Sequence, residues 1–169
     1  MTSSECRKLV SGTGSQPLKF ITVLKKLVNH PALLEGPDLE MISDFLPSNF
    51  DPKKCQSEMS GKMSLLEKML GKMRSESRDK IVLISNYTQT LDMMEKMCRQ
   101  RQWGVLRLDG SMTIPKRQKL VDQFNDLTQP EFVFLLSSKA GGCGLNLVGA
   151  NRLILFDPGE IPFLSSSLP

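Results

Sequence analysis

The most informative segment of this 169-residue chain is a glycine-rich run whose composition suits anion binding. It reads Ser-Ser-Lys-Ala-Gly-Gly-Cys-Gly-Leu-Asn-Leu over residues 137–147, and it follows the short apolar run Phe132–Leu136. Glycines let backbone amides approach an anion closely, and Lys139 adds a positive charge beside them. Ligands of open parallel sheets bind at the carboxyl ends of the strands, so a phosphate site is expected here. A plain glycine-rich turn between a strand and a helix is the alternative.

Two further polar segments each follow an apolar run. The segment 107–112, Arg-Leu-Asp-Gly-Ser-Met, contains Gly110 and Ser111, which with Thr113 can offer amides and hydroxyls to a backbone phosphate. A turn followed by a helix cap is the alternative there. The segment 85–90, Ser-Asn-Tyr-Thr-Gln-Thr, can likewise contact phosphates or simply cap a helix.

Two common nucleotide-binding motifs are absent from the sequence. The run 142–144 gives Gly-x-Gly, but Leu147 stands where the third glycine of a dinucleotide fingerprint would fall. Gly61-Lys62 is followed by Met63 where a Walker A loop needs serine or threonine, and Gln56 replaces its first glycine. A Rossmann-type oxidoreductase therefore fits the fold pattern but not the glycines, and this chain has no P-loop.

The elements that position these segments alternate between strands and helices from Lys80 onwards. Strands are predicted at Ile81–Ile84, Val105–Leu108, Phe132–Leu136 and Arg152–Phe156. The helices between them have apolar faces formed by Leu91, Met94 and Cys98, and by Leu120, Val121 and Phe124. Thr113 is suited to cap the second of these helices, and Pro115 suits its first turn. The alternation indicates an α/β fold, a parallel sheet with helices on both faces.

The N-terminal part of the sequence predicts helices and a linker, with no strands. Helical spacing predicts a first helix that ends before Pro31, with the stripe Leu18, Ile21, Leu24 and Leu27. Prolines over 35–58 indicate a linker with one short helix near Leu39–Phe45. A further helix is predicted over Met59–Met73, with the stripe Met59, Met63, Leu66, Leu70 and Met73. We therefore expect a helical extension and linker over 1–58, an α/β lobe over 59–158 and a disordered tail over 159–169.

Composition sets broad limits on the function. With 40% hydrophobic and 24% charged residues the chain is typical of one globular domain, and its net charge of +4 is compatible with nucleic acid. The four cysteines are far apart and His30 is the only histidine, so no metal site is predicted. Scattered thiols, no signal peptide and no bilayer-length apolar run predict an intracellular protein that is not in a membrane.

The three polar segments together resemble a known family. The run 138–147 is similar to motif V of the Swi/Snf family of superfamily-two DNA translocases, 85–90 to its motif IV, and 107–112 to its next motif block. Leu24–Pro31 resembles the helix that precedes the second lobe in this family, and Ser60–Lys62 the helix that leads into it. The amino-acid sequences of these motifs are most similar to those of the recombination-repair branch, the Rad-fifty-four type, and favour its B paralogue. The likeness covers residues 17–158.

The resemblance implies a RecA-like second helicase lobe of a nuclear, ATP-dependent translocase that acts on double-stranded DNA in homologous recombination and double-strand break repair. It implies ATP and Mg²⁺ as cofactors of the complete parent protein, and duplex DNA and a recombinase filament as partners. Residues expected on the DNA side are Ser85, Asn86, Asp109, Gly110, Ser111, Ser138, Lys139, Ala140 and Gly141. Residues expected on the nucleotide side are Gly142, Gly144 and Asn146.

The sequence departs from the family after Asp157-Pro158. The family continues with Trp-Asn-Pro and an arginine-bearing motif VI, whereas this chain continues with Gly-Glu-Ile-Pro over residues 159–162. It also lacks the first lobe with its Walker residues. We therefore expect a truncated splice or reading-change product with no catalytic residues, no tightly bound cofactor and no ATPase activity alone. The alternatives are a decoy that binds DNA or partner proteins without turnover, and a product too unstable to act.

Overall fold

The computed structural model describes residues 16–40, 42–54, 56–140 and 144–157. The chain forms two compact units, Met1–Leu65 and Leu66–Pro169. The division falls inside helix α4 (Gly61–Glu76), beyond the predicted boundary at residue 58. The tail predicted over 159–169 lies outside the described residues. No helix in the described part of the chain is both long and apolar enough to cross a bilayer.

The first unit is helical. Its elements are α2 (Gln16–Asn29), the 3-10 turn η1 (Pro31–Leu33), α3 (Pro37–Glu40), η2 (Ser43–Phe45), η3 (Ser57–Met59) and the start of α4. Helix α2 ends before Pro31 as predicted, and Leu27 of its predicted apolar stripe packs against the core, but Ile21 and Leu24 of that stripe do not. Val23 is the buried residue, whereas Ile21 and Leu24 are 47% and 38% exposed.

The segment predicted as a linker is partly packed. Ile42 of this segment is buried with Leu34 and with Val23 of α2, and Leu39 and Leu46 lie half-buried against them. In place of one helix over Leu39–Phe45, the structure has the two short pieces α3 and η2. The sequence shows that these residues are apolar. The frequent prolines predicted a linker, so the shared core was not predicted.

The end of α2 and the start of α4 are joined by hydrogen bonds. Ser60 Oγ donates to the carbonyl oxygen of Asn29 at 2.6 Å, and Lys62 Nζ donates to Asn29 Oδ1 at 2.6 Å. The two segments that resemble the helices before and at the start of the lobe are therefore in direct contact.

His30 should titrate below its ordinary pKa of about 6.5. The side chain is buried, Nε2 donates to the carbonyl oxygen of Gln56 at 2.8 Å, and Nδ1 accepts from the amide of Ala32 at 3.0 Å. Burial lowers the pKa of this imidazole because it disfavours the charged form. A proton on Nδ1 would also displace the Ala32 hydrogen bond.

The unfolded chain therefore binds this proton more tightly, and stability should fall as the pH drops below about 6.5. Because the chain has one histidine, an NMR titration of its ring reads this pKa directly. His30→Gln should remove the corresponding part of the pH dependence of unfolding. A ring pKa at or above 6.5 would contradict the buried neutral imidazole.

The second unit contains the predicted sheet. Its strands are β1 (Ile81–Ser85), β2 (Gly104–Leu108), β3 (Glu131–Ser137) and β4 (Arg152–Leu155), in the order β2-β3-β1-β4. Every neighbouring pair is parallel, and Ser85 pairs with Ser137 at the end of the central strands. The predicted strand positions and the α/β class are confirmed.

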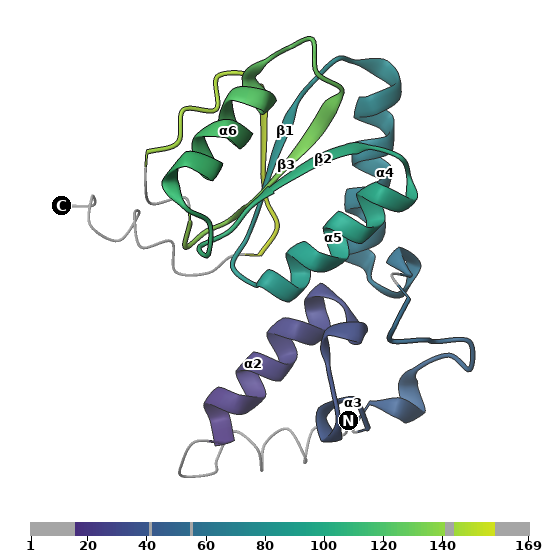
Figure 1. Ribbon diagram of the computed structural model, residues 1–169. Coiled ribbons are helices and arrows are strands. Elements are labelled where there is room, and N and C mark those ends of the chain that lie inside the picture. The colour runs from purple at the N-terminus through teal and green to yellow at the C-terminus, as the bar shows by residue number, and fades with distance from the viewer. Residues whose placement is uncertain (1–15, 41, 55, 141–143, 158–169) are drawn as a thin grey trace, which may run out of the picture. The chain divides into compact units, whose positions relative to one another are not determined.

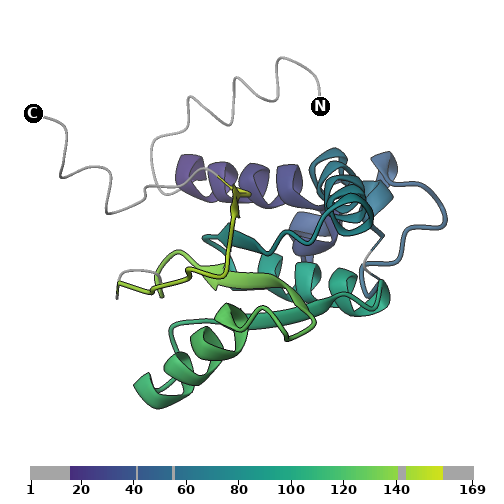
Figure 2. The same ribbon diagram turned by 90° about the horizontal axis from the view of Figure 1, so that it is seen from above.

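Helices cover both faces of this sheet (Figure 1). Helix α6 (Ile114–Asn125) packs Val121 and Phe124 against Val82 and Phe134, while α4 and α5 (Thr88–Gln100) lie on the other side (Figures 1 and 2). The predicted inner face of α5 is fully buried, at Leu91, Met94 and Cys98.

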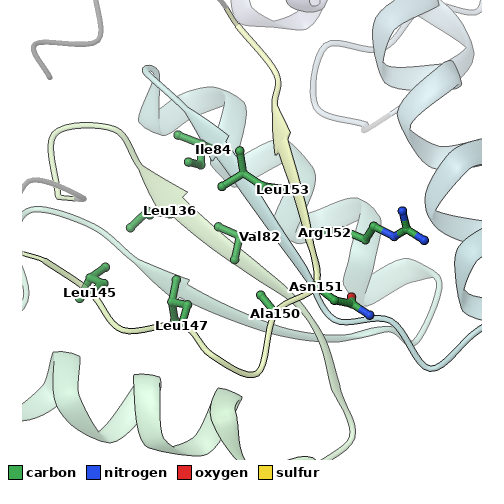
Figure 3. Close-up of a pocket in the computed structure, with 9 residues that line it drawn as sticks. All are labelled: Val82, Ile84, Leu136, Leu145, Leu147, Ala150, Asn151, Arg152 and Leu153. Carbon is green, nitrogen blue, oxygen red and sulfur yellow. The ribbon is translucent and has the colours of Figure 1, made fainter. Parts of the chain in front are cut away.

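The α6 face of the sheet has an opening beside β4. An apolar pocket of about 460 Å³ lies there, lined by Val82, Ile84, Leu136, Leu145, Leu147, Ala150, Asn151, Arg152 and Leu153 (Figure 3). Leu153 points to the same side as Val82, with which it pairs, yet it remains 67% exposed. Residues 144–151 cross this face without forming a helix.

Candidate nucleic-acid interface

The loops that carry the predicted site emerge along one edge of the sheet. Because all four strands are parallel, their carboxyl ends lie together. The strand order places the loop after β3 between the loops after β2 and β1. The three polar segments recognised in the sequence are therefore adjacent in space, with the Lys139 loop in the middle.

The turn at the start of the loop after β3 exposes the side chain of Lys139. Ser138, Lys139 and Ala140 form a turn in which Ser138 is half-buried and Lys139 is exposed. Ala140 was expected on the DNA side, but the structure places its methyl group in the core, 1% exposed. Its amide donates to the carbonyl oxygen of Ser137 at 2.9 Å, so Ala140 serves the packing of this turn.

The loop after β1 separates two residues that were predicted together. Ser85 is completely buried, and its Oγ donates to Asp157 Oδ2 at 2.7 Å, so its hydroxyl does not face DNA. Asn86 is half-buried, and its Oδ1 accepts a hydrogen bond from Ser138 Oγ. Tyr87 occupies the N-cap of α5 without a side-chain cap bond, so these polar residues do not serve mainly as a cap.

The loop after β2 is a hydrogen-bonded turn. The Asp109 carboxylate accepts from the amide of Ser111 at 3.1 Å and from its Oγ at 2.5 Å. The side-chain hydrogen bond from Ser111 lowers the pKa of Asp109. A carboxylate repels phosphate, so Asp109 shapes the turn while Gly110 and Ser111 are exposed at its surface. Thr113 is the N-cap residue of α6 as predicted, but it makes no side-chain cap bond.

Basic residues at the start of α6 extend this surface and were missed in the sequence. Lys116 and Lys119 are exposed on the first turns of the helix, which begins at the same edge of the sheet. Arg117 orders the preceding loop by donating to the carbonyl oxygens of Met112 at 3.0 Å and Gly110 at 3.3 Å. Cations near a helix N-terminus are unfavourable for the helix, and α6 has three of them close to its start with no acidic residue in the first turn. This unusual charge pattern is the sequence signal that could have indicated a binding role for these residues.

Of the residues expected on the nucleotide side, the structure describes Gly144 and Asn146. Gly142 lies outside the described residues, as does Gly141, which was expected on the DNA side. Gly144 is exposed with a left-handed φ of 61°, a conformation that favours glycine. The carbonyl oxygen of Asn146 accepts from Asn125 Nδ2 at 2.8 Å, at the opposite end of α6 from the loop of Gly110 and Ser111.

Few of the described residues lie where the sequence predicts nucleotide contacts. The part of the chain that the structure describes contains no group of three or more His, Cys, Asp or Glu side chains that could hold a metal ion. The nucleotide side offers an exposed glycine and an exposed asparagine, and the sequence has no P-loop.

The family model described as "Helicase conserved C-terminal domain" matches residues 61–166. The chain belongs to this helicase C-terminal domain family. The match begins at the first residue of α4 and contains the whole sheet, so the α/β lobe deduced from the sequence is the helicase C-terminal domain.

Relatives of this helicase domain are named for DNA repair. The chain is 57% identical to the "DNA repair protein rhp54" of Schizosaccharomyces pombe, over 96% of this chain and 20% of that protein. It is 57% identical to the "DNA repair and recombination protein RAD54" of Saccharomyces cerevisiae, over 95% and 19%. The chain thus spans about a fifth of these relatives. The similarity to the Rad-fifty-four type is confirmed, and the B paralogue stays a prediction.

Solved structures agree on the fold of the helicase domain. The Sulfolobus solfataricus SWI2/SNF2 ATPase C-terminal domain is 26% identical with a TM-score of 0.68, over 89% of this chain and 60% of that one. The SWI2/SNF2 ATPase core of that organism in complex with dsDNA is 24% identical with a TM-score of 0.70, over 89% and 29%. The chain therefore has the fold of the RecA-like C-terminal lobe of Swi2/Snf2 ATPases.

Proposed function

We propose that this helicase domain binds the phosphate backbone of double-stranded DNA through the carboxyl edge of its sheet. The observation that carries the proposal is the order of the loops. Exposed Lys139 lies between the loop of Gly110 and Ser111 and the loop of Asn86. Lysine, hydroxyl, amide and backbone N–H groups are the usual phosphate ligands, and Lys116 and Lys119 add charge at the same edge.

The wider role follows from the named relatives. We infer that the complete protein is an ATP-dependent translocase on duplex DNA that acts in homologous recombination and double-strand break repair. ATP and Mg²⁺ would then be its cofactors, a recombinase filament its partner and the nucleus its location. These inferences rest on the relatives named for DNA repair and recombination and on the Swi2/Snf2 fold.

Lys139→Ala should weaken DNA binding equally for every duplex sequence. Phosphate contacts carry no base information, so affinity is expected to be independent of sequence. Removing one phosphate contact should reduce the slope of log affinity against log salt by about 0.9. Fluorescence anisotropy with two unrelated duplexes over a salt series measures both effects. The matched control is Lys72→Ala, an exposed lysine on α4 whose loss should change neither. An unchanged slope for Lys139→Ala would mean that this lysine does not contact phosphate.

The isolated 169-residue chain should release no phosphate from ATP when duplex DNA is added. ATP hydrolysis in this class needs a lysine and magnesium site and an arginine finger, and the finger alone contributes about 10³–10⁵ in rate. The sequence contains neither the P-loop nor motif VI. A DNA-dependent phosphate release that is lost in Gly144 or Asn146 variants of the purified chain would refute this expectation.

A further inference from the structure

A buried carboxylate lies behind the proposed DNA surface. Asp157 follows β4 and is 4% exposed. Its Oδ2 accepts from Ser85 Oγ at 2.7 Å and its Oδ1 accepts from the amide of Asn86 at 2.8 Å. Asn86 Nδ2 in turn donates to the carbonyl oxygen of Asp157 at 3.3 Å. A buried charge requires such donors, so this carboxylate fixes the start of the loop after β1.

The same contacts reach the loop after β3. Asn86 Oδ1 accepts from Ser138 Oγ, and the amide of Ser138 donates to the carbonyl oxygen of Ser85 at 3.1 Å. The side chain of Asn86 therefore bridges Asp157 and Ser138, and Ser138 is the residue immediately before Lys139. Asp157 thus joins the loops after β1, β3 and β4: its carboxylate holds Ser85 and the backbone of Asn86, and its carbonyl oxygen accepts from the Asn86 side chain that contacts Ser138.

We propose that Asp157 is a positioning residue for DNA binding. It holds Asn86, and through Asn86 it holds Ser138, in the orientation that the DNA-facing loops need. Asp157 does not touch the DNA, because it is buried and its charge would repel phosphate. The inference rests on the proposed DNA-binding function and adds to it a residue that acts from behind the surface.

The chain contains a matched control for a purely structural role. Asp79 ties the same two strands together at the opposite edge of the sheet. Its Oδ1 accepts from Asn151 Nδ2 at 2.6 Å and its Oδ2 accepts from Arg152 Nε at 3.1 Å. Loss of either carboxylate should loosen the β1–β4 pair, but only Asp157 is connected to the DNA-facing loops.

The experiment compares Asp157→Ala with Asp79→Ala in the full 169-residue chain. Duplex affinity is measured by anisotropy, and melting temperature is measured on the same samples. We expect Asp157→Ala to weaken DNA binding about tenfold and Asp79→Ala to weaken it less than twofold, although both lower the melting temperature. Equal losses of affinity in the two variants would overturn the positioning role.

Two further variants keep the inference testable if Asp157→Ala does not fold. Asp157→Asn should retain most of the affinity, because its Oδ1 can accept from the Asn86 amide and its Nδ2 can donate to Ser85 Oγ. Ser85→Ala removes one donor to the carboxylate from a buried position and should weaken binding severalfold. Ser85→Ala binding as tightly as the unmodified chain would overturn the inference.

Lys139→Ala is measured in parallel to separate the two claims. If it leaves DNA binding unchanged, the proposed DNA surface fails and this inference fails with it. If it weakens binding while Asp157→Ala behaves like Asp79→Ala, the DNA surface stands and only the positioning role of Asp157 is overturned.

Discussion

Replacing Lys80 by methionine should lower the free energy of unfolding by about 2–4 kcal/mol. Lys80 is 6% exposed, and its Nζ donates to the carbonyl oxygens of Phe124 at 2.8 Å and Asp126 at 2.7 Å. The ammonium group also lies 5.3 Å from the centroid of the Phe124 ring. Methionine keeps the volume of the stem but leaves the carbonyl groups at the end of α6 without their charged donor.

Urea unfolding measures this loss, and Lys72→Met is its matched control. Lys72 is an exposed residue of α4 whose ion pair with Glu76 is at the surface, so its replacement should change stability by less than about 0.5 kcal/mol. A Lys80→Met variant as stable as Lys72→Met would show that the ammonium does not hold the end of α6.

Leu153→Lys should reduce self-association of the chain. Leu153 and Leu155 of the edge strand β4 are 67% and 40% exposed, beside an apolar pocket on the α6 face. Exposed apolar surface and an unprotected strand edge both promote association. A lysine at position 153 adds charge to this edge at little cost to folding, because the leucine is already mostly exposed.

Sedimentation velocity at increasing concentration measures this effect. The unmodified chain should shift to larger species, and Leu153→Lys should remain near the monomer mass of 18.9 kDa. Leu127→Lys is the control, because Leu127 is 76% exposed but does not line the pocket. A chain that is already monomeric at high concentration would refute the prediction, as would equal behaviour of the two variants.

The sheet could be predicted from the sequence because each of its strands and covering helices is indicated by a short stretch of consecutive residues. Each strand is a short apolar run, and the faces of α5 and α6 follow helical spacing. The inner face of α2 could not be predicted this way. Val23 is buried, whereas Ile21 and Leu24 are exposed, because Val23 packs against Leu34 and Ile42. Those two residues lie among prolines in a stretch without helical periodicity, so the sequence does not reveal this contact.

The residues of the candidate site were predictable as a group, but their roles were not. Polar residues after three strands indicated one edge of a parallel sheet, and the structure places them side by side. Whether a given hydroxyl faces outward depends on contacts distant in sequence. Ser85 is turned inward by Asp157, and Ala140 is drawn into the core by the packing of its turn. Spacing within one segment carries no information about such contacts.

The most direct test of the DNA surface is a map of backbone amide NMR shifts during titration with a short duplex. If DNA binds at the carboxyl edge, the perturbed amides should cluster at Asn86, Ser111, Ser138 and Lys139. Amides at the opposite edge, such as Asp79 and Asn151, should remain unchanged. Perturbations that cluster at the amino edge, or on α2 around Lys25 and Lys26, with none in the loops after β1, β2 and β3, would contradict the proposed function.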